Sequence, residues 1–462
     1  MSSPNNEEFD DSNFEWSFLE LTAKMQQLLK DDRQNITKAL SAKRHTFSRP
    51  ETSFQRRLSM ASEVTSANVL DSLPKTVSAI YKRTGEMKED LDRWSFDIFA
   101  LSSSTSGHPM QALAFDIFTI HDLLNVFQLT EEHFMKFIVH VERHYRSNPY
   151  HNACHAADVL QTLNCMVCKT GFLNTMNHLE LFCLFLTAII HDIEHTGTNN
   201  SFHKNSGSDF AKLYVVNVLE NHHLRVGLKA IQEFEILRSL DPGKYDEFQY
   251  MLVTMILATD MANHFMLITN MKLMLSMPTK CKNRIRIKRI LLLLLHCADI
   301  SNPAKPWDLH KIWVSLLIEE FFLQANKEKE MKLPITPNCD RNTANIATLQ
   351  IGFMQTFSKD TFIVTDQLME QELVQGGFTY IRYQPWHDCM EENMTKWSGK
   401  WKFLKYDQIN ELMAETVKPR LSMASPPRKG SYNKVMDQTI CFCCRRGRKR
   451  YSSEEDTACA AC

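Results

Sequence analysis

A long central stretch of the chain, from about residue 69 to residue 401, is dense in Leu, Ile, Phe and Met and has few runs of alternating polarity. Its apolar residues recur at helical spacing, as at Phe115 and Phe118 and again at Phe134, Phe137 and Ile138. Glycine is scarce, with 13 in 462 residues. These features predict a single large all-α domain.

Composition changes on both sides of this stretch. Residues 1–70 are rich in Ser, Asn and charged side chains, and contain one amphipathic helical pattern over Phe14–Lys30. Beyond about Thr416 the sequence turns to Pro, Ser, Lys and Arg, which is typical of a flexible tail. We therefore expect a regulatory or disordered region over 1–70, the helical domain over 71–415 and a basic, cysteine-containing tail over 416–462.

Charge and cysteine usage narrow the class of protein. The formal net charge is −1 and the pI is about 7.0, so the chain lacks the global positive field that nucleic-acid-binding proteins use. The 13 cysteines are scattered and no signal peptide is apparent, which predicts free thiols in the cytoplasm. The two most apolar runs, Leu181–Ile190 and Ile290–Leu295, are shorter than the roughly 18 residues of a membrane span and predict buried helices.

Three separated fragments carry residue types that bind metal ions: HNACH at His151–His155, HDIEH at His191–His195 and HCADISNP at His296–Pro303. The second and third follow or end the apolar runs, so their polar residues would be delivered to an interior, where they are costly unless paired or bound to metal. Pro149 marks a helix start in the first fragment, which would put both of its histidines on one face, with Asp158 one turn further. His195 would likewise lie one turn after His191.

The kinds of ligand indicate the chemistry. His155, His191, Asp192 and Asp299 form a mixed nitrogen and oxygen set that can hold zinc, while a carboxylate can bridge to a harder ion such as magnesium. Two such ions lower the pKa of a shared water and stabilise an in-line displacement at phosphorus. His151, not needed as a ligand, is a candidate general acid for the leaving oxygen. His140–His144 has the same spacing, and we interpret it as a chance pair.

From about Asp90 to about Phe362 the chain resembles the catalytic domain of the class I cyclic nucleotide phosphodiesterases. The resemblance rests on eight motifs that occur in the same order: YHNACHAADV, HDIEHTGTNNSFH, VLENHH, ILATDM, HCADISNPAKPW, EEFFLQ, CDR and QIGF. The resemblance implies a compact multi-helix fold of the HD superfamily. It also implies hydrolysis of 3′,5′-cyclic nucleotides to 5′-nucleoside monophosphates by a hydroxide that two divalent ions activate, zinc and magnesium or manganese.

The resemblance also assigns roles to single residues. His151 matches the general acid, and the ligands match His155, His191, Asp299 and a bridging Asp192. Three residues match positions that hold the waters of the magnesium ion: His195, Glu220 and Thr259. The residues that match substrate contacts are Tyr150, Asn302, Gln350 (hydrogen-bonded to the purine), Phe353 (stacked on the base) and Leu317 (on its other face).

Within the family, DRWSFDIF, HDIEHTGTNN and PAKPWDLH are most similar to the calcium/calmodulin-stimulated branch. Asn302 stands where that branch typically has His, whereas branches that prefer cyclic AMP typically have Asn. We therefore expect cyclic AMP as the favoured substrate, with cyclic GMP as a second candidate. Phe14–Lys30, followed by basic residues, is a candidate calmodulin target, and a docking helix is the alternative.

Both flanking regions contain modification motifs. The hexapeptide RLSMAS occurs at Arg57–Ser62 and at Arg420–Ser425, which makes Ser59 and Ser422 candidate phosphosites for a basophilic kinase or chance basic strings. Cysteines near the C-terminal end suit prenylation or palmitoylation beside a basic run, and so predict a membrane contact: Cys441, Cys443, Cys444 and Cys459. The alternatives are a solvated tail with idle thiols and a nuclear import signal.

Two other functions compete with a phosphodiesterase. One is a different HD-type metal-dependent nucleotide phosphohydrolase, against which the Gln350–Phe353 base clamp argues. The other is a non-catalytic cyclic-nucleotide sensor or scaffold, which would need a broken metal set. We also expect a homodimer as a candidate assembly.

Overall fold

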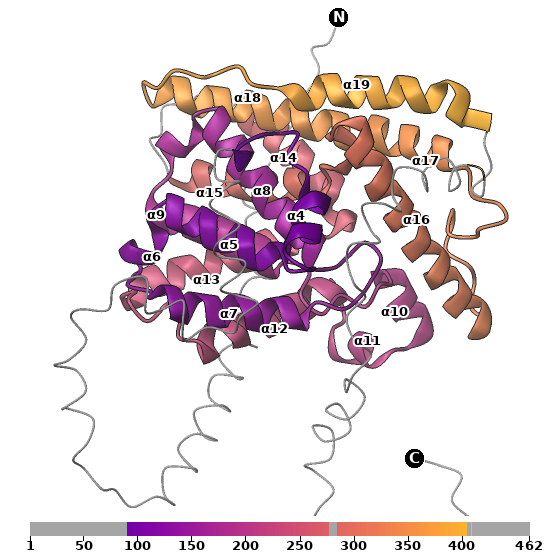
Figure 1. Cartoon of the computed structure of the whole chain (residues 1–462), viewed down its shortest axis with the longest axis horizontal. Helices are drawn as coiled ribbons and strands as arrows, with labels where there is room; N and C mark the ends of the chain where they lie inside the picture. The colour runs from indigo at the N-terminus through magenta and orange to yellow at the C-terminus, as the bar shows by residue number, and fades with distance from the viewer. Residues whose placement is uncertain (1–89, 277–283, 404–407, 409–462) are drawn as a thin grey trace, which may run out of the picture. The chain divides into compact units, whose positions relative to one another are not determined.

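The computed structural model describes residues 90–276, 284–403 and 408 (Figure 1). Several predictions fall outside these residues: the helix over Phe14–Lys30, the phosphosites Ser59 and Ser422, and the tail residues Cys441, Cys443, Cys444 and Cys459. The predicted boundaries of the helical domain, 71 and 415, also fall outside them and stay predictions.

The described residues form helices and no strand, which confirms the all-α prediction for this part of the chain. The first half contains α4 (Ile98–Ser104), α5 (Pro109–Ile120), α6 (Leu123–Val126), α7 (Glu131–His144), α8 (Ala153–Lys169), η2 (Phe172–Thr175), α9 (His178–Ile190), α10 (Asn200–Ser206), α11 (Asp209–Leu213) and α12 (Val218–Glu233).

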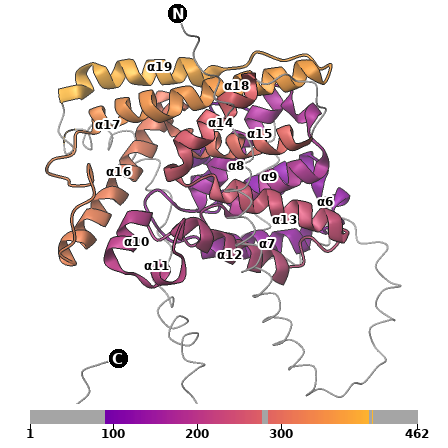
Figure 2. The same ribbon diagram turned by 180° about the vertical axis from the view of Figure 1, so that it is seen from behind.

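The second half contains α13 (Pro242–Leu257), η3 (Met261–Asn263), α14 (His264–Ser276), α15 (Arg284–Asp299), η4 (Asn302–Ala304), α16 (Trp307–Glu330), α17 (Ile346–Phe353), η5 (Met354–Ser358), α18 (Lys359–Gln375), α19 (Pro385–Ser398) and η6 (Lys400–Phe403). Figures 1 and 2 show α18 and α19 side by side along one edge of the helical domain.

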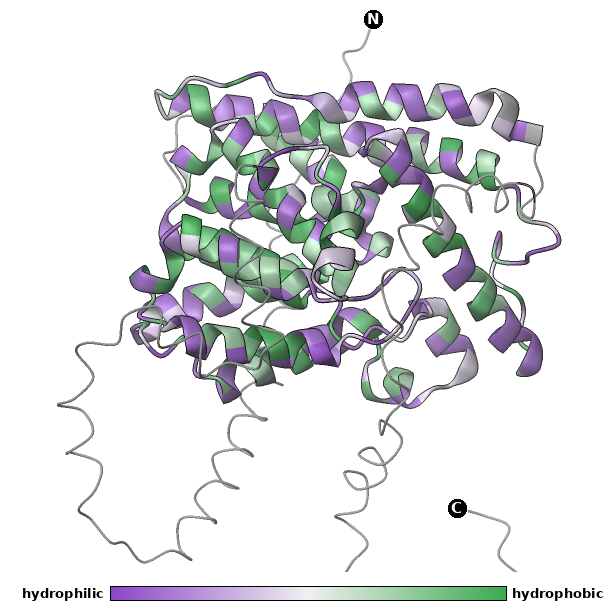
Figure 3. Cartoon of the chain, viewed as in Figure 1, coloured by the Kyte–Doolittle hydropathy of each residue, from purple (hydrophilic) through white to green (hydrophobic). Residues whose placement is uncertain are grey.

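The core is built around α9, which packs against α5, α8, α13 and α15. Every residue of the run Leu181–Ile190 is buried, as the sequence predicts for a helix that is apolar on all sides. The helix begins with a capping box, in which the Asn177 side chain accepts from the Glu180 N–H and the Glu180 carboxylate accepts from the Asn177 N–H. Figure 3 shows that helices differ in hydropathy: α5 is largely hydrophobic, whereas α19 alternates between hydrophobic and hydrophilic residues.

Two helix boundaries differ from the prediction. Helix α8 begins at Ala153, because the Asn152 side chain accepts from the N–H groups of Cys154 and His155 and so caps it; His151 therefore lies in the segment before the helix. Helix α9 ends at Ile190, and the left-handed Glu194 (φ 60°) turns the chain before His195. Neither histidine pair therefore spans a helical turn. Helix α15 ends at Asp299, as predicted.

Among the described residues, no single helix combines the length and apolar character needed to cross a membrane. The consecutive segments Pro242–Leu257 and Met261–Ser276 meet that requirement only together, as a pair bent by 85°. The seven cysteines in this part of the chain are all free thiols.

Candidate active site

The four predicted metal ligands converge from three elements. His155 comes from the first turn of α8, His191 and Asp192 follow the end of α9, and Asp299 ends α15. His155 Nε2 lies 3.0 Å from Asp299 Oδ1 and 3.6 Å from Asp192 Oδ2. His191 Nε2 lies 3.3 Å and 3.4 Å from the same two oxygens. All four side chains can therefore offer a ligand atom to one ion.

The spacing and protonation of these ligands fit a divalent ion. In a tetrahedral zinc site, bonds of about 2.0–2.2 Å put neighbouring ligand atoms roughly 3.4 Å apart, close to the observed separations. His191 donates from Nδ1 to the Ala188 carbonyl at 2.9 Å, and its fully buried Nε2 has no hydrogen-bond partner. Burial lowers the pKa of this ring, but Asp192 and Asp299 outweigh it and raise that pKa well above its ordinary value, so a bound cation would take the place of the proton on Nε2. A ring held by a carbonyl with its other nitrogen turned toward carboxylates is the usual arrangement of a metal-ligating histidine.

The charges of the site also suit a cation. Burial would raise the pKa of Asp192 and of Asp299, but the neighbouring imidazoles more than offset this and hold both pKa values well below the usual range. Both carboxylates are therefore ionised at neutral pH.

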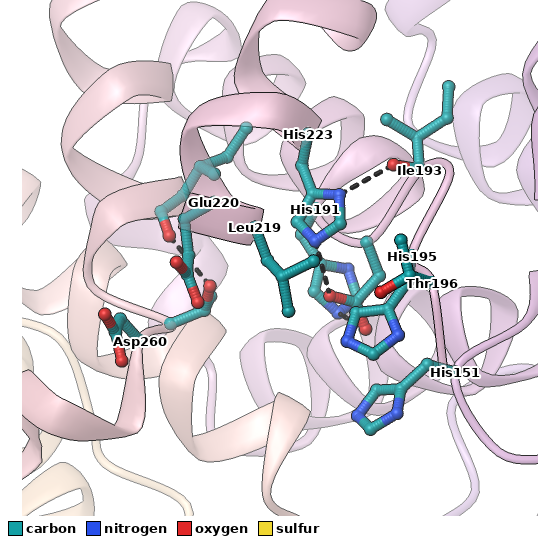
Figure 4. A network of polar contacts seen from close by, with 12 residues as sticks. His151, His191, Ile193, His195, Thr196, Leu219, Glu220, His223 and Asp260 are labelled. Atoms are coloured by element: carbon teal, nitrogen blue, oxygen red, sulfur yellow. Dashed lines mark hydrogen bonds and ion pairs between the residues drawn. The ribbon is translucent and has the colours of Figure 1, made fainter. Parts of the chain in front are cut away.

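Asp192 also belongs to a second group of potential ligand atoms, together with His195 and His223. Figure 4 shows these two histidines near His191. The Asp192 Oδ1 atom is 3.7 Å from Nε2 of His223, and His223 donates from Nδ1 to the Ile193 carbonyl at 2.6 Å. Burial lowers the pKa of His223 to about 4, so its ring is neutral. The two oxygens of Asp192 thus face different imidazoles, as a bridging carboxylate requires. No role was predicted for His223, because VLENHH offers two adjacent histidines and only the fold decides which one points inward.

Glu220, predicted together with Thr259 to hold waters of the second ion, is buried and forms an acidic pair with the partly buried Asp260. Asn200 donates from Nδ2 to both Glu220 carboxylate oxygens and to Asp260. Burial, followed by the negative charge of Asp260, raises the pKa of Glu220 to about 8. Thr259 donates its hydroxyl hydrogen to the Ile256 carbonyl at 2.7 Å. The water-holding roles of these residues stay predictions.

His151, the predicted general acid, is held by a glutamate that the sequence did not single out. Glu320, on α16, accepts from His151 Nδ1 at 2.5 Å and from the backbone N–H groups of Tyr150 (2.9 Å) and His151 (3.0 Å). Burial by itself lowers the pKa of His151, but the Glu320 carboxylate outweighs it and raises that pKa to about 9. The ring of His151 stacks on that of His195, with centroids 4.1 Å apart and planes 28° apart. The ring of His151 is therefore protonated at neutral pH.

The predicted substrate contacts lie on several elements. Tyr150 is buried, with its ring 4.9 Å from that of His155, and Asn302 in η4 accepts through Oδ1 from His310 Nδ1 at 2.7 Å. Gln350 is buried on α17. Phe353 and Leu317 are partly buried, at the end of α17 and on α16. Their contacts with a nucleotide stay predictions.

Three further residues lie outside the site. His140 and His144, interpreted as a chance pair, have ring centroids 4.2 Å apart and do not join any group of potential metal ligands among the described residues. Asp158, one turn after His155, instead pairs with the buried Lys305 at 3.1 Å.

Comparison with known proteins agrees with this geometry. Residues 150–375 match the model of the 3′5′-cyclic nucleotide phosphodiesterase family. They form a phosphodiesterase domain of that family. The resemblance that the sequence motifs indicated is thereby confirmed.

Several curated relatives are named as calcium/calmodulin-dependent enzymes. The dual specificity calcium/calmodulin-dependent 3′,5′-cyclic nucleotide phosphodiesterase 1C of Homo sapiens is 39% identical over 313 residues, covering 64% of this chain and 44% of the relative. The dual specificity enzyme 1B of Mus musculus is 39% identical over 290 residues (62% and 54%), and the dual specificity enzyme 1 of Drosophila melanogaster 38% over 310 residues (66% and 36%). The chain spans about half or less of the length of these relatives.

Proposed function

We propose that this phosphodiesterase domain hydrolyses 3′,5′-cyclic nucleotides to 5′-nucleoside monophosphates and so ends second-messenger signals. The observation that carries the proposal is the convergence of His155, His191, Asp192 and Asp299 beside the His151–Glu320 pair. The family of the domain supports the same reaction.

The ligand set suits two ions. The four converging residues would hold zinc, and the group of Asp192, His195 and His223 would hold magnesium or manganese. When bound, they would supply a water of lowered pKa and offset negative charge at phosphorus. His151 then does the remaining chemistry. As the oxygen of the attacking hydroxide bonds to phosphorus, the bond from phosphorus to O3′ breaks, and Nε2 of His151 gives its proton to that leaving oxygen. Glu320 keeps the ring protonated and oriented through Nδ1.

Cyclic AMP is the favoured substrate in this proposal, with cyclic GMP as a second one. Asn302 supports the preference, since its amide oxygen is held by His310, which itself accepts from Trp397 Nε1 at 2.8 Å. An amide held in one orientation discriminates between purine edges more sharply than a free one. The relatives are named as dual specificity enzymes, which supports turnover of both nucleotides.

Regulation and location are also part of the proposal. The relatives are named as calcium/calmodulin-dependent, and Phe14–Lys30 is the candidate calmodulin target in this chain, with a docking helix as the alternative. The protein would act in the cytoplasm, as a homodimer or a monomer. Cysteines of the tail, Cys441, Cys443, Cys444 and Cys459, would give it a membrane contact.

The test compares hydrolysis of cyclic AMP and cyclic GMP by the purified full chain in magnesium, with and without calcium–calmodulin. We expect turnover of both nucleotides, faster for cyclic AMP. Asp299→Ala should reduce turnover by more than about 100-fold and lower the metal content, because it removes the carboxylate that lies beside both ligating histidines, His155 and His191. Asp209→Ala, at an exposed carboxylate that pairs with Lys212, is the matched control and should keep full activity. Metal-loaded wild-type protein that cleaves neither nucleotide would favour the other phosphohydrolase or the sensor.

A further inference from the structure

The segment between α7 and α8 contains a side chain that joins the two histidine fragments. Asn148 donates from Nδ2 to the carbonyl oxygen of His151 at 2.8 Å and to that of His195 at 2.7 Å. Both hydrogens of this amide are therefore used. The backbone carbonyl of Asn148 accepts in turn from Asn152 Nδ2 at 2.9 Å, which ties it to the N-cap of α8.

The backbone of His151 is consequently held from both sides. Its N–H is donated to Glu320, and its carbonyl accepts from Asn148. His195 is held similarly, because its N–H is donated to the Asp192 carbonyl at 3.0 Å while its own carbonyl accepts from Asn148. A residue outside regular helices has no helical hydrogen bonds to fix its backbone, so these contacts fix the backbone from which each imidazole extends, while Glu320 also holds the His151 ring through Nδ1.

The amide of Asn148 fits closely against the second fragment. Gly197 has φ +68°, and a Cβ atom added there would lie 2.8 Å from Asn148 Oδ1. The absence of a side chain at Gly197 thus allows the approach of Asn148 as well as the left-handed turn. We call the two hydrogen bonds from Asn148 to the carbonyls of His151 and His195 the clamp. The rings of these two histidines stack on each other, and Figure 4 shows them side by side.

We propose that Asn148 is a positioning residue, which sets the general acid His151 against His195 by bonding the carbonyl of each. The inference rests on the proposed function, because it requires His151 to be the proton donor. Asn148 has no part in the proton transfer and acts only through where it places that ring. A displacement of about 1 Å at a catalytic group can cost on the order of 100-fold in rate, so loss of the clamp should be visible in kcat.

The experiment is a double-mutant cycle in the full-length, metal-loaded protein. We expect Asn148→Ala and the isosteric Asn148→Asp, which cannot donate, each to lower kcat for cyclic AMP by roughly 10- to 100-fold. In a His151→Ala background the same changes should lower kcat by less than about threefold, because the ring they position is gone. Metal content and melting temperature are measured for every variant to show that it folds and keeps its ions.

Asn393→Ala is the matched control. Asn393 also donates both amide hydrogens to carbonyls, those of Pro303 (2.9 Å) and Lys305 (2.8 Å), and neither bond goes to His151 or His195. Its effect on kcat should be the same with and without His151. A crystal structure of Asn148→Ala should show the two rings no longer stacked.

Three results would overturn the inference. Asn148 variants could slow both backgrounds by the same factor, which would make the role merely structural while leaving the proposed function intact. They could leave kcat and the ring stacking unchanged. His151→Ala alone could turn over at the wild-type rate, and then the general acid of the proposed function would be wrong as well.

Discussion

At the scale of single residues, the His151–Glu320 pair decides how the site responds to pH. The pKa of His151 is raised to about 9 by the Glu320 carboxylate, so the imidazolium is present below that pH and is lost as pH rises through it. The same pairing lowers the pKa of Glu320 to about 2, against the effect of its burial. Between these values both groups are charged, which is the state that a proton donor needs.

Glu320→Gln should move the alkaline limb of the kcat profile for cyclic AMP to lower pH. An amide keeps a hydrogen-bond acceptor but loses the negative charge that raises the pKa of His151, so the ring deprotonates earlier. The measurement is kcat between pH 6 and 10 for both proteins. Glu319→Gln is the matched control, because the neighbouring Glu319 pairs with the half-exposed Arg341. An unchanged alkaline limb in Glu320→Gln would show that another group controls it.

At the scale of helices, the position of His191 depends on how closely α12 packs against the end of α9. Gly227 lies on α12, and a Cβ atom added there would be 2.6 Å from Ile190 Cδ1 and 3.2 Å from Ile190 Cβ. Ile190 is fully buried and is the last residue before His191. The missing side chain therefore allows the helix that carries Glu220 and His223 to approach the metal ligands.

We expect Gly227→Ala to destabilise the protein, although alanine in a helix usually stabilises by about 0.5–1 kcal/mol over glycine. Overpacking against Ile190 costs about 1–3 kcal/mol, which outweighs that gain. The measurement is urea denaturation. Gly243→Ala in α13 is the control, because its added Cβ meets only Asp241 Oδ1 at an ordinary 3.5 Å and should be neutral or stabilising. A Gly227→Ala protein more stable than wild type would mean that Ile190 moves aside freely.

At the scale of the whole helical domain, burial of neutral histidines makes folding sensitive to acid. Burial lowers the pKa of His296 to about 4 and that of His310 to about 3, and both side chains are fully buried. The unfolded chain binds protons at these residues near their ordinary pKa of about 6.5, whereas the folded protein does not. Stability from these groups is therefore complete above about pH 6.5 and is lost as pH falls below it.

We expect the free energy of unfolding of metal-free protein to be lower at pH 5.0 than at pH 7.5, by on the order of 2 kcal/mol for each of these two histidines. Urea denaturation in the presence of a chelator measures it. His310→Gln should show a smaller difference between the two pH values than wild type, because one titrating group has been removed. Equal stability of the wild-type protein at both pH values would contradict the expectation.

Much of the metal site could be predicted from the sequence because its ligands stand where apolar helices end. An apolar run such as Leu181–Ile190 has to be buried, so the polar residues that follow it, His191 and Asp192, arrive inside the domain. Asp299 reaches the same interior at the end of α15. Neither inference needs the path of the chain between them.

Helix boundaries were harder to predict, since capping is a local contest between several polar side chains. Pro149 and Asn152 both suit the start of a helix, and the amide of Asn152 captures two N–H groups, which begins α8 at Ala153. His151 is left outside the helix, where Asn148 and Glu320 hold it.

By itself, the sequence determined the all-α class of the described residues, the four residues that converge on one metal position and the family of the domain, because each depends on local periodicity or on ordered motifs. Only the tertiary structure decided that Glu320 faces His151, 169 residues earlier, and that His223 rather than His222 faces Asp192. Adjacent identical residues on a helix are equivalent in sequence but point in directions about 100° apart, and packing chooses which of them is buried.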